Sequence, residues 1–246
     1  MTYAEYSRAR EAAGLDPALV ASRCRLDVTT VSAWDSQAAA GQVLPDRHAA
    51  TIRGFLHEAL CDLLKNLCED AFKKVPSEYV AIWLVVDQRE CVLFPGACRN
   101  QDLVPFRVAA KENVEIRVRR DDQSLTAYPL FRSRKLLNLA GDAIKEHEEK
   151  KHRSRANAVF SGGICESLLH VPAFYNGESN SAPVLLLSLE NKLDKKQVIV
   201  RTGGDRTPVY SEADEVLAGK LAMEFEARLR PLLALPGILT PKRAEA

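Results

Sequence analysis

SLLHVPAFYNGESNSAPVLLLSLENK, residues 167–192, holds two apolar runs on either side of the turn-rich NGESNS. Each run has the length and apolar character of a buried strand, and the polar residues between them predict a reversal of the chain. Upstream, residues 78–94 contain two strand-like runs around the polar DQRE, and residues 113–120, NVEIRVRR, alternate as a half-buried strand should. The sequence therefore predicts an antiparallel sheet, to which residues 196–208 could add a further hairpin.

Long helical patterns accompany the predicted sheet. Residues 211–235 have helical periodicity, and Ser211 with Asp214 three residues later approximates a capping box. Residues 47–74 also keep one face apolar at helical spacing. Residues 133–155, SRKLLNLAGDAIKEHEEKKHRSR, predict a further helix with a highly charged end.

Residues 1–54 differ from the rest of the chain, because they predict short helices and no strand. The first helical pattern ends at Gly14, and Asp16 and Pro17 are suited to begin the next helix as its N-cap and first-turn residue. Asp27 can cap a third helix, VTTVSAWD. The sequence therefore predicts a small all-α domain ahead of the α+β part.

Residues 8–54 resemble a helix-turn-helix of the Xre/Cro phage-repressor family. Ala21 is the small residue where the two helices cross, and Leu26 is the apolar residue of the turn. Val31 and Trp34 stand where the recognition helix of that family packs against its partner. The resemblance implies a DNA-binding module that places its recognition helix in the major groove.

The same resemblance implies a structural pair and shows two departures. Arg10 and Asp35 stand where family members place a buried arginine–acid pair that ties the first helix to the recognition helix. Arg25 and Gln37 occupy positions where the family customarily has glycine. Arg25 is tolerated there only if its backbone avoids the left-handed region, which is the expectation for this chain.

Docking in the manner of that family would turn the start of the recognition helix toward base edges. The exposed positions there are small residues, Val28, Thr29, Thr30, Ser32 and Ala33. Threonine can contact bases or a thymine methyl, but none of these residues makes a bidentate contact with a base. The candidates for phosphate contacts are Arg8, Arg23 and Arg25.

The charge of this module leaves a second interpretation open. Residues 1–54 contain six arginines and six acidic residues, so the module is neutral when His48 is uncharged. A neutral surface lacks the electrostatic attraction that supports tight DNA binding. The alternative is a pair of helices used for packing or for contact with another protein.

Residues 55–234 resemble a GAF domain, a small-molecule sensor. The implied layout is a helix, a central antiparallel sheet, a late strand pair and a closing helix beside the first. Five residues follow the order of the NKFDE signature of cyclic-nucleotide-binding GAF domains, with Tyr in place of Phe: Asn191, Lys192, Tyr210, Asp214 and Glu215. In that family the lysine and the aspartate pair and fix the closing helix on the sheet, a role that many GAF domains keep without binding a cyclic nucleotide.

The implied ligand site lies between the sheet and the crossover segments, at residues 96–165. Arginines and lysines there, such as Arg117 and Arg132, could hold a phosphate-bearing ligand such as a nucleotide. The alternative is a solvated charged face. No metal ligand set is found, and no cofactor other than such a small molecule is implied.

Composition excludes several other classes. The chain has 246 residues, 46% of them hydrophobic, and a net charge of +1, which is ordinary for a soluble globular protein. The longest apolar run, residues 79–86, is too short to cross a membrane, and the N-terminus lacks a secretory signal. We expect a cytoplasmic protein whose six cysteines are reduced. Cys91 and Cys98 lack the setting of the methionine-sulfoxide-reducing GAF proteins, and no nucleophile–base pair indicates an enzyme.

These observations predict an α+β protein with three parts: a helix-turn-helix domain at residues 1–54, a GAF-like sensor at 55–235 and a flexible tail at 236–246. The expected function is regulation of transcription by a homodimer that binds an inverted repeat in DNA and responds to a small-molecule effector. A dimer seam is expected from apolar residues of the two long helices, Leu56, Leu60, Leu63, Leu67, Leu221, Phe225 and Leu229. The alternative function is a sensor or adaptor whose N-terminal helices contact a partner protein. The seam residues also have an alternative role, as core residues of the sensor.

Overall fold

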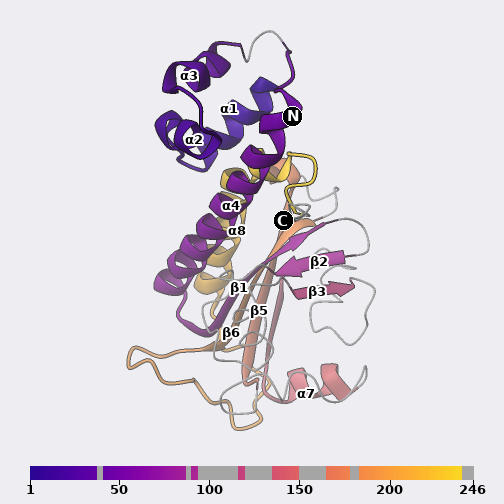
Figure 1. Ribbon diagram of the computed structural model, residues 1–246. Helices are drawn as coiled ribbons and strands as arrows, with labels where there is room; N and C mark the ends of the chain where they lie inside the picture. The colour runs from indigo at the N-terminus through magenta and orange to yellow at the C-terminus, as the bar shows by residue number, and fades with distance from the viewer. Residues whose placement is uncertain are drawn as a thin grey trace. The chain divides into compact units, whose positions relative to one another are not determined.

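The computed structural model describes residues 1–37, 41–86, 90–93, 116–119, 135–149, 165–177 and 183–239 (Figure 1). The chain divides into two compact units. Unit 1 comprises residues 1–63 and 227–246, and unit 2 comprises residues 64–226. The long helices α4 (Asp46–Lys74) and α8 (Glu212–Leu233) each belong in part to both units. The predicted domain boundary at residue 54 therefore falls inside a continuous helix.

Residues 1–37 of unit 1 form three short helices, α1 (Tyr3–Ala12), α2 (Pro17–Cys24) and α3 (Val28–Ser36). A capping box between Thr2 and Glu5 begins α1. The Asp16 carboxylate accepts a 2.7 Å hydrogen bond from the backbone of Ala18 and begins α2, with Pro17 in its first turn. Local sequence signals therefore set the starts of the first two helices.

Two details of the turn between α2 and α3 differ from the sequence expectations. Arg25 has φ 54° and ψ 48°, so it ends α2 in the left-handed conformation that it was expected to avoid. Its backbone N–H bonds the carbonyl of Ser22, and the next amide, that of Leu26, bonds the carbonyl of Ala21. These bonds offset the roughly 1–2 kcal/mol that a left-handed L-residue costs. Asp27 lies at the N-cap of α3, but its side chain makes no capping hydrogen bond.

Within the described part of unit 2, six strands form one antiparallel sheet in the order β3-β2-β1-β6-β5-β4. The strands are β1 (Ser77–Val85), β2 (Glu90–Leu93), β3 (Ile116–Arg119), β4 (Leu137–Ala140), β5 (Ser167–Phe174) and β6 (Pro183–Lys192). The predicted pairs β1–β2 and β5–β6 both form. A short 3₁₀ helix, η3 (Tyr175–Gly177), follows β5. The prediction of an α+β chain with an antiparallel sheet is confirmed.

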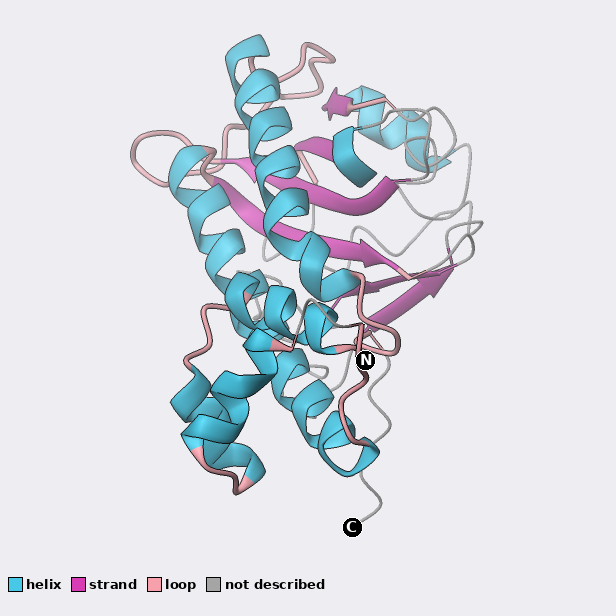
Figure 2. Ribbon diagram, turned by 90° about the horizontal axis from the view of Figure 1, so that it is seen from above, coloured by secondary structure: helices cyan, strands magenta, loops and turns pink. Residues whose placement is uncertain are grey.

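The register across β1, β6 and β5 gives the sheet two chemically different faces. The centre of one face is aliphatic and buried, with the rows Val80–Leu189–Leu169, Ile82–Leu187–Val171 and Leu84–Leu185–Ala173. The segments of α4 and α8 that belong to unit 2 lie along one side of the sheet (Figures 1 and 2). Asn138 of β4 bonds Glu215 of α8, and β4 alternation puts Asn138 on the aliphatic face. The helices therefore cover the aliphatic face.

Two predictions for unit 2 are corrected. The segment predicted as one helix at residues 133–155 contains the strand β4 and then the helix α7 (Asp142–Glu149). Leu137–Ala140 pairs with β5, so sheet pairing overrides the local helical pattern. Residues 196–208 add no hairpin to the sheet, because only an isolated bridge between Leu193 and Ile199 forms there.

The predicted dimer seam is contradicted for six of its seven residues, and the seventh, Leu63, is partly buried. Each of these residues except Leu63 is at most 1% exposed within a single chain: Leu56, Leu60, Leu67, Leu221, Phe225 and Leu229. They are core residues and present no face to a second copy.

Part of the predicted flexible tail, residues 236–246, is packed within unit 1. Ile238 is buried, and its carbonyl oxygen lies 2.7 Å from Nδ1 of His57 within unit 1. Residues 240–246 lie outside the described residues.

Candidate functional site

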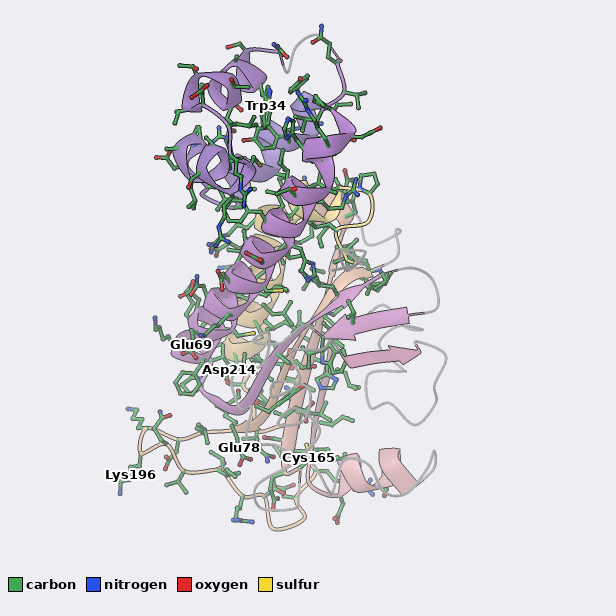
Figure 3. All side chains as sticks on the ribbon, in the orientation of Figure 1. Trp34, Glu69, Glu78, Cys165, Lys196 and Asp214 are labelled. Atoms are coloured by element: carbon green, nitrogen blue, oxygen red, sulfur yellow. The ribbon has the colours of Figure 1, made fainter. Side chains whose placement is uncertain are left out.

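The helix pair α2 and α3 is closed by buried small and apolar side chains. Ala21 is 1% exposed, as its predicted place at the helix crossing requires. Val31 and Trp34 of α3 are also buried, and Leu26 in the turn is partly buried. Trp34 lies among the side chains of unit 1 (Figure 3), where its ring centroid is 5.6 Å from that of Tyr6 in an edge-on arrangement. One side of α3 is thereby anchored in the unit.

The opposite side of α3 faces solvent. All five residues predicted to meet DNA are exposed: Val28, Thr29, Thr30, Ser32 and Ala33. Since Val31 and Trp34 point inward, the helix presents a face of small polar and apolar residues to solvent. The structure therefore leaves this face accessible.

The arginines predicted to contact phosphate are also exposed. Arg23 lies with its guanidinium carbon 5.4 Å from the ring centroid of Phe55, a cation–π geometry that leaves the charged edge available. Arg25 ends α2 in its left-handed conformation with its side chain in solvent. Arg8 donates from Nε to the carbonyl of Ala4.

The structure brings Arg10 and Asp35 together. Nη2 of Arg10 lies 3.2 Å from Oδ2 of Asp35, and Nη1 donates to the carbonyl of Leu15 at 2.8 Å. The Ser7 hydroxyl donates to Oδ1 of the same carboxylate at 2.5 Å. Burial, and then the Asp35 carboxylate, raise the pKa of Tyr6 far above its ordinary value despite the opposing charge of Arg10. The carboxylate thus ties α3 to α1 through two donors.

Replacing Asp35 with alanine is expected to lower the free energy of unfolding by about 1–3 kcal/mol, because the largely buried Arg10 then keeps only the carboxylate of the exposed Glu11, 3.7 Å away. Urea unfolding followed by circular dichroism measures the change. Asp62→Ala is the matched control, since Asp62 is exposed on α4, and its loss should cost less than about 0.5 kcal/mol. Equal midpoints for Asp35→Ala and the wild type would contradict a stabilising pair.

In unit 2, the predicted signature residues gather where β6 meets the start of α8. Lys192 contacts the Asp214 carboxylate, and its ammonium nitrogen lies 5.7 Å from the ring centroid of Tyr210. The Tyr210 hydroxyl is buried against that of Ser77 at 2.9 Å, and burial raises its pKa well above the ordinary value. These contacts fix the start of α8 to the sheet, as in the structural role implied by the resemblance.

The remaining two signature residues extend this cluster. Asn191 has φ 53°, and its side chain accepts from the backbone of Glu166 and donates to Glu78, both at 2.7 Å. Glu215 accepts a 2.7 Å hydrogen bond from Asn138, whose amide also bonds the Tyr210 carbonyl. All five residues therefore have structural partners within the protein.

Asp214→Asn is expected to cost about 1–2 kcal/mol at pH 7 and little near pH 3. Burial raises the pKa of Asp214, but hydrogen bonds from Lys192 and Ser211 outweigh it and hold the pKa below its ordinary value. A lowered folded pKa contributes stability that is fully present above the unfolded value of about 4 and is lost as pH falls through the folded value. Urea unfolding of both proteins from pH 7 to pH 3 gives the difference. Parallel profiles over that range would contradict this prediction.

The second face of the sheet carries polar side chains that the sequence analysis missed. Its central rows are Tyr79–Glu190–Leu168, Ala81–Ser188–His170 and Trp83–Leu186–Pro172. His170 is 2% exposed, and its Nε2 lies 2.9 Å from Oε1 of Glu190. Because the carboxylate accepts, Nε2 carries a proton. Among the described residues, the buried Nδ1 of His170 has no hydrogen-bond partner.

The unsatisfied His170 nitrogen makes the polar face a candidate small-molecule site. An unsatisfied buried nitrogen costs about 1–3 kcal/mol, so this position favours a bound polar group. Trp83 and Leu137 pack on Leu186 beside it and supply an apolar surface. The sequence signal was present, because His170 and Glu190 interrupt otherwise apolar strands. Their pairing depends on the register between β5 and β6.

Other predicted site residues are not placed. Most of the predicted ligand-site range 96–165 lies outside the described residues, as do Arg132 and Cys98, and the side chain of Arg117 is not described. Cys91 is buried in β2. Within the described ranges, no cluster of His, Cys, Asp and Glu could hold a metal ion. A shallow depression of about 460 Å³ lies on α8 alone, between Glu212 and Lys220.

Comparison with known proteins identifies no family. No protein-family model matches the sequence, and no curated protein sequence matches it. Among solved structures, the chain is similar to the GAF domain/HD domain protein from Geobacter sulfurreducens, with 14% identity and a TM-score of 0.43 over 70% of this chain and 92% of that chain. A similarity this low carries no argument about function. In the part of the chain that is described, no helix has the length and apolar content needed to span a membrane.

Proposed function

We propose that this protein regulates transcription by binding DNA through unit 1 and a small molecule through unit 2. The observation that carries the DNA-binding half is the accessible face of α3, which is anchored on its other side by Val31 and Trp34. A short helix that is anchored on one face and carries small residues on the other can approach the base edges of a major groove closely.

The proposed contacts divide by role. Thr29 and Thr30 in the first turn of α3 meet base edges, and Val28 and Ala33 offer methyl groups to thymine. Arg23 and Arg25 at the end of α2 contact phosphates and set the register of the helix in the groove. These few contacts on a neutral module give weak binding by one copy. Two linked copies on an inverted repeat gain affinity through effective concentration, which favours a homodimer on DNA.

The small-molecule half rests on the polar face of the sheet. His170 offers its free Nδ1 as an acceptor when neutral and as a donor when protonated. The partly buried indole of Trp83 packs against the buried Leu186 and offers an apolar ring surface beside His170. A nucleotide or another flat heterocycle with polar edges fits this combination.

A second candidate function is contact with a partner protein through the same helices. Two apolar side chains favour it, because Leu19 of α2 and Val28 of α3 are 46% and 47% exposed. The neutral charge of residues 1–54 favours it as well.

Selection from sheared genomic DNA of the source organism separates the two functions. Purified protein is mixed with fragments at physiological salt, and bound fragments are recovered and sequenced. We expect one enriched short inverted repeat with half-sites about one helical turn apart, or a multiple of it. No enrichment, together with a protein partner recovered from the same cells, would favour the adaptor.

Thermal unfolding with cyclic AMP, cyclic GMP or AMP tests the small-molecule half, since a ligand that binds the folded state raises Tm. We expect one of them to raise Tm in the wild type and to have no effect on His170→Leu. No shift with any of the three excludes these nucleotides as effectors.

A further inference from the structure

His57 and Cys61 of α4 form a contact that neither proposed activity uses. They are one helical turn apart, so their side chains lie on the same face of the helix. Sγ of Cys61 lies 3.8 Å from Nε2 of His57. Both side chains are partly buried, and Cys61 is present as a thiol.

The other ring nitrogen of His57 fixes how this contact works. Nδ1 lies 2.7 Å from the carbonyl oxygen of Ile238. A carbonyl oxygen can only accept, so Nδ1 carries the proton of the neutral ring. Nε2 is then left with its lone pair directed toward the thiol. The carbonyl thus orients the imidazole, and the imidazole is placed to accept the proton of Cys61.

We infer that Cys61 is an activated thiol and a site of oxidation by hydroperoxides, with His57 as its base and the Ile238 carbonyl as the positioning group. Nε2 takes the proton from Sγ, and the thiolate attacks the terminal oxygen of the peroxide. The S–O bond forms as the O–O bond breaks. The leaving oxygen takes the proton back from the imidazolium and departs as water or an alcohol. Sulfur is oxidised by two electrons to the sulfenic acid, and the peroxide is reduced by two.

Three of the other described cysteines are less accessible than Cys61. Cys68, Cys91 and Cys165 are buried. Cys24 is partly buried like Cys61, but no hydrogen bond to a histidine is found for it among the described residues, and burial raises the pKa of its thiol. Cys24 therefore serves as an internal control, because its exposure is similar to that of Cys61 but no histidine base is found beside its thiol among the described residues.

The test compares alkylation rates of single cysteines by peptide mass spectrometry, with iodoacetamide as the probe at pH 7. An ordinary thiol is only about 3% thiolate at that pH, so we expect Cys61 to react at least about tenfold faster than Cys24. With hydrogen peroxide as the probe, dimedone labelling should find sulfenic acid at Cys61 first. His57→Gln keeps a donor for the Ile238 carbonyl but removes the base, and it should lower the Cys61 rate about tenfold. An unchanged rate in that variant overturns the inference.

The wild-type pH profile provides a measurement that needs no variant. The alkylation rate of Cys61 should reach its plateau below about pH 8, whereas that of Cys24 should still rise at pH 9. Parallel profiles for the two cysteines would overturn the inference even if His57→Gln failed to fold.

Discussion

Replacing Gly141 with alanine is expected to lower the free energy of unfolding by about 3 kcal/mol. Gly141 joins β4 to α7 with φ 51°, a conformation that alanine adopts only at a cost. A β-carbon there would overlap the backbone carbonyl oxygen of Asp205 and lie 2.8 Å from Oγ1 of Thr202. The Gly141 amide also donates to the Glu166 carbonyl at 3.0 Å, so the backbone is held in place. The loop before α8 would have to move away.

Gly203→Ala is the matched control, because it separates the close contact from the backbone conformation. Gly203 has φ 61°, but a β-carbon there would meet nothing within 4 Å. This change should cost about 1 kcal/mol, the penalty of the left-handed conformation alone. Urea unfolding of the two variants measures both values. Equal losses would show that the loop does not approach Gly141 as closely as described.

The double substitution Thr29→Glu and Thr30→Glu is expected to weaken DNA binding by more than about 100-fold. Both residues are exposed in the first turn of α3, where the proposed docking would bring added carboxylates against the DNA phosphates and cause repulsion. Acidic residues are favourable at a helix N-terminus, so the fold should be preserved. Fluorescence anisotropy with the selected duplex at physiological salt measures the affinity, and circular dichroism checks the fold.

A charge-matched double variant tests whether the loss of DNA affinity is specific to α3. Val198→Glu with Met223→Glu adds the same two charges to unit 2, at side chains that are 58% and 59% exposed. This pair should leave DNA affinity within about threefold of the wild type, because its charges lie in unit 2 and not on the helix proposed to meet DNA. Equal losses in the two double variants would indicate a general charge effect and would contradict docking through α3.

The features that the sequence predicted well depend on short-range patterns. Asp16, Pro17 and Gly14 act locally, and they set the helix ends where expected. The strand pair at residues 167–192 follows from two apolar runs and a turn. The Arg10–Asp35 contact could not be predicted from local patterns, because the two residues are 25 positions apart. Only the resemblance to a helix-turn-helix linked them.

The features that the sequence did not predict depend on long-range placement. Leu137–Ala140 is a strand only because β5 pairs with it, and its local composition favours a helix. The left-handed conformation of Arg25 accompanies backbone hydrogen bonds of the closed turn, which no local sequence pattern shows. The His170–Glu190 pair follows from strand register, and the His57–Cys61 contact gains its chemistry from a carbonyl 181 residues away in the chain. No pattern within a helix or a strand contains that information.

Hydrogen–deuterium exchange of the whole protein, with and without the selected duplex, tests most directly whether α3 is the surface that meets DNA. If selection gives no single duplex, sheared genomic DNA at low salt is used as the probe. We predict slower amide exchange across Arg23–Ser36 when DNA is added, and no change in β6, whose amides lie in the sheet of unit 2. Unchanged exchange in α3, under conditions where DNA is bound, would contradict the account.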